Sequence, residues 1–186
     1  EDVERVMNMA MSKTKDLVLM QCNTNYTGSK ENFKYCNLNV LKSFSIKYPE
    51  IILGLSDHTP GHSTTLGAIA LGARVIEKHF TDDNNQVGPD HAFAMNPLSW
   101  REMVDRSYEL LSALGDGIKR VEPNEEQSRL VQRRCIRVNS DLKAGHTITD
   151  EDLIVLRPIS DGGIEPFDKE KIIGMQLIND IEAGEH

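Results

Sequence analysis

Two histidines 21 residues apart are the clearest candidates for chemistry in this chain. His58 and His79 each follow a short run that is typical of a β-strand, residues 51–55 and 74–76. A single helix-length segment joins the two runs, which predicts a parallel βαβ unit whose strand ends lie side by side. Both imidazoles can then reach one ligand or one borderline divalent metal, such as Mn²⁺, Fe²⁺ or Zn²⁺.

Two further polar residues are in phase with the histidines. Side chains alternate along a strand, so Ser56 is expected on the face of His58, and Glu77 on the face of His79. The hydroxyl can bind an anionic ligand, and the carboxylate can orient a metal ligand or act in acid–base chemistry. The alternative is that both histidines only hydrogen-bond backbone at strand ends, but the matched placement of four polar residues favours a shared site.

A polar turn and an arginine are weaker candidates. Asp90 lies in the turn Gly88–Pro89–Asp90–His91, where it could contact a polar substrate or only stabilise the turn. Arg157 follows the apolar run 153–156 and could bind an anion or a carbonyl group. From the residues alone, a surface role is favoured for Arg157.

Strands and helices that could position these residues alternate up to residue 115. Strands are expected at 17–20, 51–55 and 74–76, and helices at 1–14, between Phe33 and Pro49, at 63–72 and from Asn96 onward. The first strand is wholly apolar and is expected to be buried on both faces of a parallel sheet. Ser63 is expected to cap the third helix, and Pro97 to open the fourth. The fourth helix is expected to bury the stripe Met103, Val104, Tyr108, Leu111 and Leu114. This order predicts a parallel α/β array with its active site at the carboxyl ends of the strands.

The sequence changes character after residue 116. Residues 117–129 are polar and acidic, which predicts a linker, and residues 130–186 contain short β-like runs and a helical turn capped by Thr149. Residues 140–145 recur as residues 179–184, an offset of 39, and the second copy stops at His186. We therefore expect this second domain to be truncated and the chain to be incomplete at both ends.

Composition limits the classes of partner and the setting. The 186 residues carry a net charge of −8, which argues against nucleic acid or an anionic membrane as the main partner. No run of 18 apolar residues is present, so no membrane span is predicted. Three cysteines without short spacing predict neither disulfides nor a zinc site built from cysteines. We expect instead that their side chains are small and buried and that the protein is cytoplasmic. They are Cys22, Cys36 and Cys135.

Several of these motifs together resemble the sialic acid synthase family, which includes legionaminic and pseudaminic acid synthases. The matching stretches are residues 54–59, 66–73, 77–81 and 88–91, followed by 141–145 and 156–158. The resemblance implies an α/β fold in which residues 1–116 form the C-terminal portion of a (β/α)₈ TIM barrel. It also implies that residues 130–186 form a small antifreeze-like domain, the SAF domain of β-clip type.

The resemblance implies an enzyme that condenses phosphoenolpyruvate with an N-acetylated amino sugar. The sugar would be N-acetylmannosamine or a diacetamido-dideoxy analogue, and the products a nine-carbon 2-keto acid and phosphate. The alternatives are a metal-dependent aldolase or hydrolase on the same barrel, and a carbohydrate-binding module without catalysis. The chain alone is expected to be inactive, because the family's first five barrel strands are absent from it.

The resemblance also implies roles for individual residues. His58 and His79 would bind Mn²⁺, or Mg²⁺ or Co²⁺ in its place, and with Glu77, which the strand phase places beside them, they are the candidate catalytic residues. Substrate contacts would come from Ser56 and Asp90, from a phosphate-binding residue among Asn23, Thr24 and Asn25, and from Arg157. Arg157 would be inserted by a neighbouring subunit of a domain-swapped homodimer. One departure is Gln21, where the family often has histidine.

Overall fold

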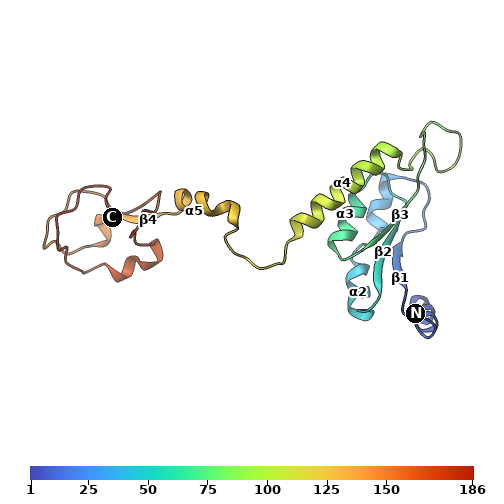
Figure 1. Ribbon diagram of the computed structural model, residues 1–186, viewed down its shortest axis with the longest axis horizontal. Coiled ribbons are helices and arrows are strands. Elements are labelled where there is room, and N and C mark those ends of the chain that lie inside the picture. The colour runs from blue at the N-terminus through green and yellow to red at the C-terminus, as the bar shows by residue number, and fades with distance from the viewer. The chain divides into compact units, whose positions relative to one another are not determined.

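The computed structural model describes residues 1–186, which divide into two compact units, residues 1–117 and 118–186. The first unit has the predicted alternation of strands and helices (Figure 1). Its helices are α1 (Asp2–Met11), the 3₁₀ helix η1 (Lys30–Tyr35), α2 (Val40–Lys47), α3 (Ser63–Ala70) and α4 (Pro97–Leu114). Its strands are β1 (Val18–Cys22), β2 (Ile52–Asp57) and β3 (Val75–Lys78). No helix in either unit has both the length and the apolar character needed to cross a bilayer.

The three strands form one parallel sheet in the order β1-β2-β3. Cys22 is the register partner of Ser56, which is in turn the partner of Glu77, so the carboxyl ends of all three strands lie at one edge. The predicted convergence of the strand ends is therefore confirmed. The loops that follow the strands bring their side chains together at this edge.

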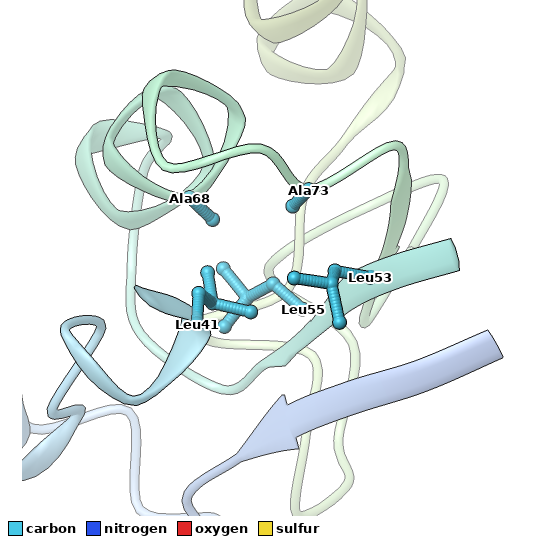
Figure 2. Packing of buried hydrophobic residues seen from close by; sticks show 5 residues of the cluster. All are labelled: Leu41, Leu53, Leu55, Ala68 and Ala73. Atoms are coloured by element: carbon cyan, nitrogen blue, oxygen red, sulfur yellow. The ribbon is translucent and has the colours of Figure 1, made fainter. Parts of the chain in front are cut away.

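Helices cover only one face of this sheet. Leu53 and Leu55 of β2 pack against Leu41 of α2, Ala68 of α3 and Ala73 to form the core (Figure 2). By the alternation of side chains, neighbouring strand residues point to the other face, where Val18, Ile52 and Val75 are exposed. The expectation that the first strand is buried on both faces is therefore wrong, because α2 and α3 pack on one face only.

Two helix predictions need correction. The single helix expected between Phe33 and Pro49 is divided into η1 and α2, and Asn37 lies between them with a φ of 46°. Asparagine tolerates this left-handed conformation better than most residues, which allows the chain to turn there. Ser63 does not cap α3, because His62 occupies the N-cap position and Ser63 is the first helical residue.

Helix α4 begins as the sequence predicts. Asn96 and Ser99 form a reciprocal capping box, and Pro97 occupies the first turn. Met103 is buried, but the distal part of the expected stripe is exposed: Tyr108, Leu111 and Leu114. The reason is length, since the helix that α4 packs against, α3, has 8 residues against 18 in α4. At a rise of 1.5 Å per residue, α3 covers about 12 Å of a helix about 27 Å long.

The second unit consists of short elements. They are the 3₁₀ helix η2 (Pro123–Glu125), α5 (Glu126–Gln132), β4 (Cys135–Val138), the 3₁₀ turn η3 (Asp150–Asp152), β5 (Leu153–Leu156) and the 3₁₀ helix η4 (Pro166–Lys171). Strands β4 and β5 are antiparallel. The predicted cap is present, because Thr149 and Asp152 form a capping box. Helical turns η2 and α5 begin within the stretch 117–129 that the sequence predicts to be a linker.

The two copies of the sequence repeat pair with each other. Leu142 and Ile181, which are equivalent at the offset of 39, exchange both backbone hydrogen bonds at 2.9 Å. A carboxylate of each copy also accepts a backbone N–H bond from the other copy at 2.9 Å, Asp141 from Ala183 and Asp180 from Ala144. The repeat therefore produces a local pseudo-twofold symmetry.

Candidate active site

The two histidines lie next to each other at the carboxyl edge of the sheet. His58 directly follows β2 and His79 directly follows β3, and their ring centroids are 5.1 Å apart with an interplanar angle of 70°. His58 is buried, whereas His79 is partly exposed. The proximity that the βαβ pattern predicts is therefore present. The role of the pair as metal ligands stays a prediction.

Each imidazole has one nitrogen engaged and one free. The Nδ1 atom of His58 lies 2.8 Å from the backbone carbonyl oxygen of Asn23, and the Nδ1 atom of His79 lies 3.4 Å from the Asp90 carboxylate. The His58 contact is within hydrogen-bond distance, and the His79 contact is at an ion-pair distance. Metal-binding histidines characteristically direct the second ring nitrogen to a carbonyl or a carboxylate, which sets the tautomer and the orientation of the ring. Both Nε2 atoms are thereby left for a ligand.

The donor set fits a divalent metal with an incomplete protein coordination shell. No group of three or more His, Cys, Asp or Glu side chains in the structure could hold a metal ion, so His58 and His79 supply two ligands at most. Water, substrate oxygens or other protein groups would have to complete the shell. Imidazole nitrogen suits borderline metals better than Mg²⁺, which prefers oxygen ligands.

Ser56 and Glu77 form a pair of their own across β2 and β3. They are register partners, and the Ser56 hydroxyl donates to Oε1 of Glu77 at 2.6 Å. They share the sheet face opposite the helices, as the phase of the two strands predicts. A hydroxyl has a single proton, so Ser56 must give up this bond before it can donate to an anionic ligand.

The three candidate phosphate contacts after β1 differ in how their side chains are used. Asn23 donates to the Tyr35 carbonyl oxygen at 3.2 Å, and Oδ1 of Asn25 accepts from the Thr27 backbone at 3.1 Å. Thr24 is exposed and its hydroxyl makes no hydrogen bond within the protein. Thr24 is therefore the member of this group whose side chain is free to bind.

Tyr26 is a site residue that the sequence analysis missed. Its ring centroid lies 4.1 Å from that of His58 and 5.6 Å from that of His79, and the ring is half-exposed. The ring centroid of Phe93 lies 5.2 Å from that of His79. The position of Tyr26 in the loop after β1 was the available signal, because loops at the carboxyl ends of parallel strands converge.

The loop that carries Asp90 is tied down by side chains. The Thr81 hydroxyl lies 2.8 Å from Nδ1 of His91, and the Asn84 amide donates to the carbonyl oxygens of His91 and Ala94 at 2.8 and 2.9 Å. These bonds hold the turn beside His79. Asp90 therefore does more than stabilise its own turn, because its carboxylate reaches the histidine pair.

Arg157 and two of the cysteines are the remaining residues singled out in the sequence. Arg157 belongs to the second unit, where it is exposed directly after β5 and lines a surface hollow of about 390 Å³ together with Arg134. The surface position favoured from the residues is confirmed, and a substrate role stays a prediction. Cys36 is buried as expected, and burial raises the pKa of its thiol. The expectation of burial is wrong for Cys22, which is exposed at the end of β1.

Comparison with known proteins gives the same family along most of the chain. Residues 1–119 match the NeuB family and residues 133–185 match the SAF domain. The N,N'-diacetyllegionaminic acid synthase of Legionella pneumophila is 37% identical over 168 residues, which is 90% of this chain and 46% of that protein. A pseudaminic acid synthase of Campylobacter jejuni is 32% identical over 173 residues, 93% of this chain and 48% of that protein.

A solved structure agrees with these matches. The spore coat polysaccharide biosynthesis protein SpsE of Bacillus subtilis is 28% identical, with a TM-score of 0.55, over 99% of this chain and 55% of its own. The chain thus spans about half the length of the curated relatives it matches. The predicted fold class, an α/β synthase segment followed by an SAF domain, is confirmed. With the family match covering residues 1–119, the chain belongs to the NeuB family.

Proposed function

We propose that the protein containing this chain condenses phosphoenolpyruvate with the open-chain form of an N-acetylated amino sugar. The observation that carries the proposal is the adjacent pair His58 and His79, each with Nδ1 engaged and Nε2 free, in a chain of the NeuB family. Carbon 3 of phosphoenolpyruvate forms a bond to the sugar aldehyde carbon. Water adds at carbon 2, and phosphate leaves by C–O cleavage to give a nine-carbon 2-keto acid.

The histidines hold the electrophilic end of the site. His58 and His79 would hold one divalent metal, most suitably Mn²⁺, through their Nε2 atoms. When bound, the metal supplies Lewis-acid polarisation of the aldehyde oxygen. The Asn23 carbonyl and the Asp90 carboxylate keep the rings in the tautomer that binds. Asp90, which is also partly exposed, accepts a hydrogen bond from a sugar hydroxyl.

Ser56, Glu77 and Thr24 act at the phosphate end. The Ser56 hydroxyl exchanges its bond to Glu77 for a bond to a phosphate oxygen, and Thr24 adds a second hydroxyl donor. The carboxylate of Glu77 is released by this exchange and accepts a proton from the water that adds at carbon 2. The Ser56 hydroxyl proton is therefore donated to Glu77 in the free site and to a phosphate oxygen in the occupied site.

Relatives suggest the order in which sugars should be tested. The two N,N'-diacetyllegionaminic acid synthases are 37% and 31% identical to this chain, and the N-acetylneuraminate-9-phosphate synthase of Mus musculus is 27% identical. A diacetamido-dideoxy sugar is therefore the preferred substrate, ahead of N-acetylmannosamine. Arg157 of a second subunit contacts the N-acetyl group in a domain-swapped homodimer.

The test is phosphate release by the native protein, expressed from its complete coding sequence, with Mn²⁺ and a panel of amino sugars. Release that requires both phosphoenolpyruvate and a sugar, and that is lost in His58→Ala, supports the proposal. Sugar cleavage without phosphoenolpyruvate would instead identify an aldolase or hydrolase. Sugar binding that survives both metal removal and His58→Ala, without turnover, would identify a binding module.

A further inference from the structure

A buried ion pair lies directly behind the two histidines. Asp57 and Lys78 are register partners on β2 and β3, and the lysine Nζ lies 2.5 Å from Oδ2 of the carboxylate. Both side chains are 2% exposed. They occupy the helix-covered face of the sheet, one residue along from Ser56 and Glu77, which occupy the other face. Neither charge can therefore touch a substrate at the histidine pair.

Every acceptor position of the Asp57 carboxylate is used. Its Oδ1 atom accepts from the backbone N–H of Thr59 at 2.9 Å and from the Thr59 hydroxyl at 2.8 Å. Its Oδ2 atom accepts from the Thr64 hydroxyl as well as from Lys78. Lys78 also donates to the backbone carbonyl oxygen of Thr59 at 2.8 Å. The ion pair thus links the residues on both sides of His58, Asp57 and Thr59, to Lys78, the residue before His79.

We propose that Asp57 and Lys78, together with the Thr64 hydroxyl, are positioning residues that set the separation of His58 and His79. A strand that ends in a loop is otherwise free to fray, and a small displacement of either ring would separate the two Nε2 atoms. The ion pair fixes the two strand ends to each other through charge and hydrogen bonds that have no competition from water. The backbone carbonyl oxygen of His79 itself accepts a hydrogen bond from the backbone N–H of Met95 at 2.8 Å. This bond holds the chain at His79, next to the ion pair at residue 78.

An alternative is that the pair contributes only to stability. A buried ion pair is weak support for stability, because desolvation of two charges offsets much of their attraction. A role in positioning the histidines explains better than a role in stability why Asp57 directly precedes His58 and Lys78 directly precedes His79. The two explanations differ in what they predict for metal affinity when stability is lost by another route.

Titration of the native protein with Mn²⁺, followed by calorimetry and by electron paramagnetic resonance, separates these explanations. This test rests on the proposed metal site, so His58→Ala and His79→Ala are measured first and should abolish binding. Lys78→Met should weaken Mn²⁺ binding about tenfold, the lower end of the loss that follows removal of a direct hydrogen-bond partner of a metal-binding histidine, because Lys78 acts through the strand ends and not on the rings themselves. Thr64→Val, which keeps the shape and removes the hydroxyl, should weaken binding severalfold, and Thr64→Ser should restore it.

Leu53→Ala is the matched control for stability. Leu53 is buried on the same strand and the same face as Asp57, but belongs to the apolar core and makes no bond to the pair. Its variant should lower the unfolding temperature and leave Mn²⁺ affinity within twofold of the wild type. A readout without metal is the nitrogen-15 spectrum of the histidine rings, in which the His58 Nδ1 proton should exchange faster with water in Lys78→Met.

The outcomes are distinct. If both histidine variants keep wild-type Mn²⁺ affinity, the proposed metal site is wrong. If the histidine variants lose binding but Lys78→Met and Thr64→Val bind within twofold of wild type, the positioning role is wrong and the metal site stands. Equal loss of affinity in Leu53→Ala and Lys78→Met would also overturn the positioning role, because the effect would then follow stability alone.

Discussion

Ser56 and Glu77 lie opposite each other on parallel strands, and the serine hydroxyl donates to the glutamate at 2.6 Å. This bond occupies the one proton that Ser56 has to offer. In the free protein the hydroxyl is therefore aimed at a carboxylate, and an incoming phosphate has to compete for it. Binding of phosphoenolpyruvate and the state of Glu77 are linked through this single hydrogen bond.

Ser56→Ala should raise the KM for phosphoenolpyruvate, but by less than the roughly tenfold to hundredfold that a hydrogen bond to a charged group, about 1.5–3 kcal/mol, would give alone, because the wild-type serine must first give up its bond to Glu77. The turnover number should fall less than the KM rises, because Glu77 remains. Steady-state kinetics of the native protein measures both. Ser99→Ala, which removes a hydroxyl from the α4 capping box, is the control and should leave KM unchanged. An unaltered KM in Ser56→Ala would remove this serine from the phosphate site.

Removal of the metal should abolish turnover, and replacement of the metal should restore it. Dialysis against EDTA followed by addition of Mn²⁺, Co²⁺, Zn²⁺ or Mg²⁺ tests the donor set, and the two imidazoles favour the first three over Mg²⁺ at equal concentration. His62→Ala, which changes a half-buried histidine near the site that has no part in the proposed chemistry, is the control. Activity that persists after exhaustive chelation would contradict the proposed mechanism.

The proposed role of Arg157 in trans predicts complementation between inactive subunits. Arg157→Ala and His58→Ala should each be inactive as pure proteins. After unfolding and refolding together, mixed dimers should recover activity, because one of the two sites combines an intact His58 with an intact Arg157. Differently tagged subunits establish that mixed dimers have formed. Mixed dimers without activity would place Arg157 in its own subunit's site or outside catalysis.

The second unit should lose stability in acid through Asp152. Hydrogen bonds from His146 and from the Thr149 backbone and hydroxyl lower the pKa of Asp152 from 3.8 to about 2. Because the folded pKa lies below the unfolded value, the stabilisation is complete above pH 4 and is lost as the pH falls towards 2. Thermal unfolding between pH 2 and pH 5 should show this loss in the wild type and a reduced loss in Asp152→Asn. Asp161→Asn, an exposed carboxylate, should behave like the wild type.

Gly54 limits the spacing of β2 and β3. A Cβ atom at this position would lie 2.7 Å from the backbone carbonyl oxygen of Val75 and 2.9 Å from Cγ of Met20. Gly54→Ala should therefore force the strands apart and lower the free energy of unfolding by about 1–3 kcal/mol, the usual cost of overpacking. Gly67→Ala in α3 is the control, because its Cβ meets only the end of the Leu38 side chain. Equal denaturation midpoints for the two variants would show that Gly54 is not needed for the close approach of β2 and β3.

The sequence predicted those features of the site that depend on periodicity. The run of apolar residues before His58 and before His79, with helix length between them, determines a parallel pair with adjacent ends. Alternation along the strands then places Ser56 with Glu77. Both are local rules, and neither depends on what the rest of the molecule contributes.

Features that depend on tertiary contacts could not be read in the same way. Exposure of Tyr108 follows from the short length of α3, which is visible only once the helices are packed. Tyr26 lies in a loop without periodicity, so its contact with both imidazoles has no sequence signal beyond position. The Asp57–Lys78 pair was likewise missed, since a charged residue in a strand is normally expected to face solvent.

The mutual pairing of Leu142 and Ile181 has a consequence for how the second unit folds. The backbone N–H and C=O groups of Leu142 bond to those of Ile181, 39 residues away in the other copy. Ordering must therefore wait until the intervening chain has closed a long loop, and such non-local closure slows folding. Once closed, both copies become ordered in the same step. We infer that the two copies also open together.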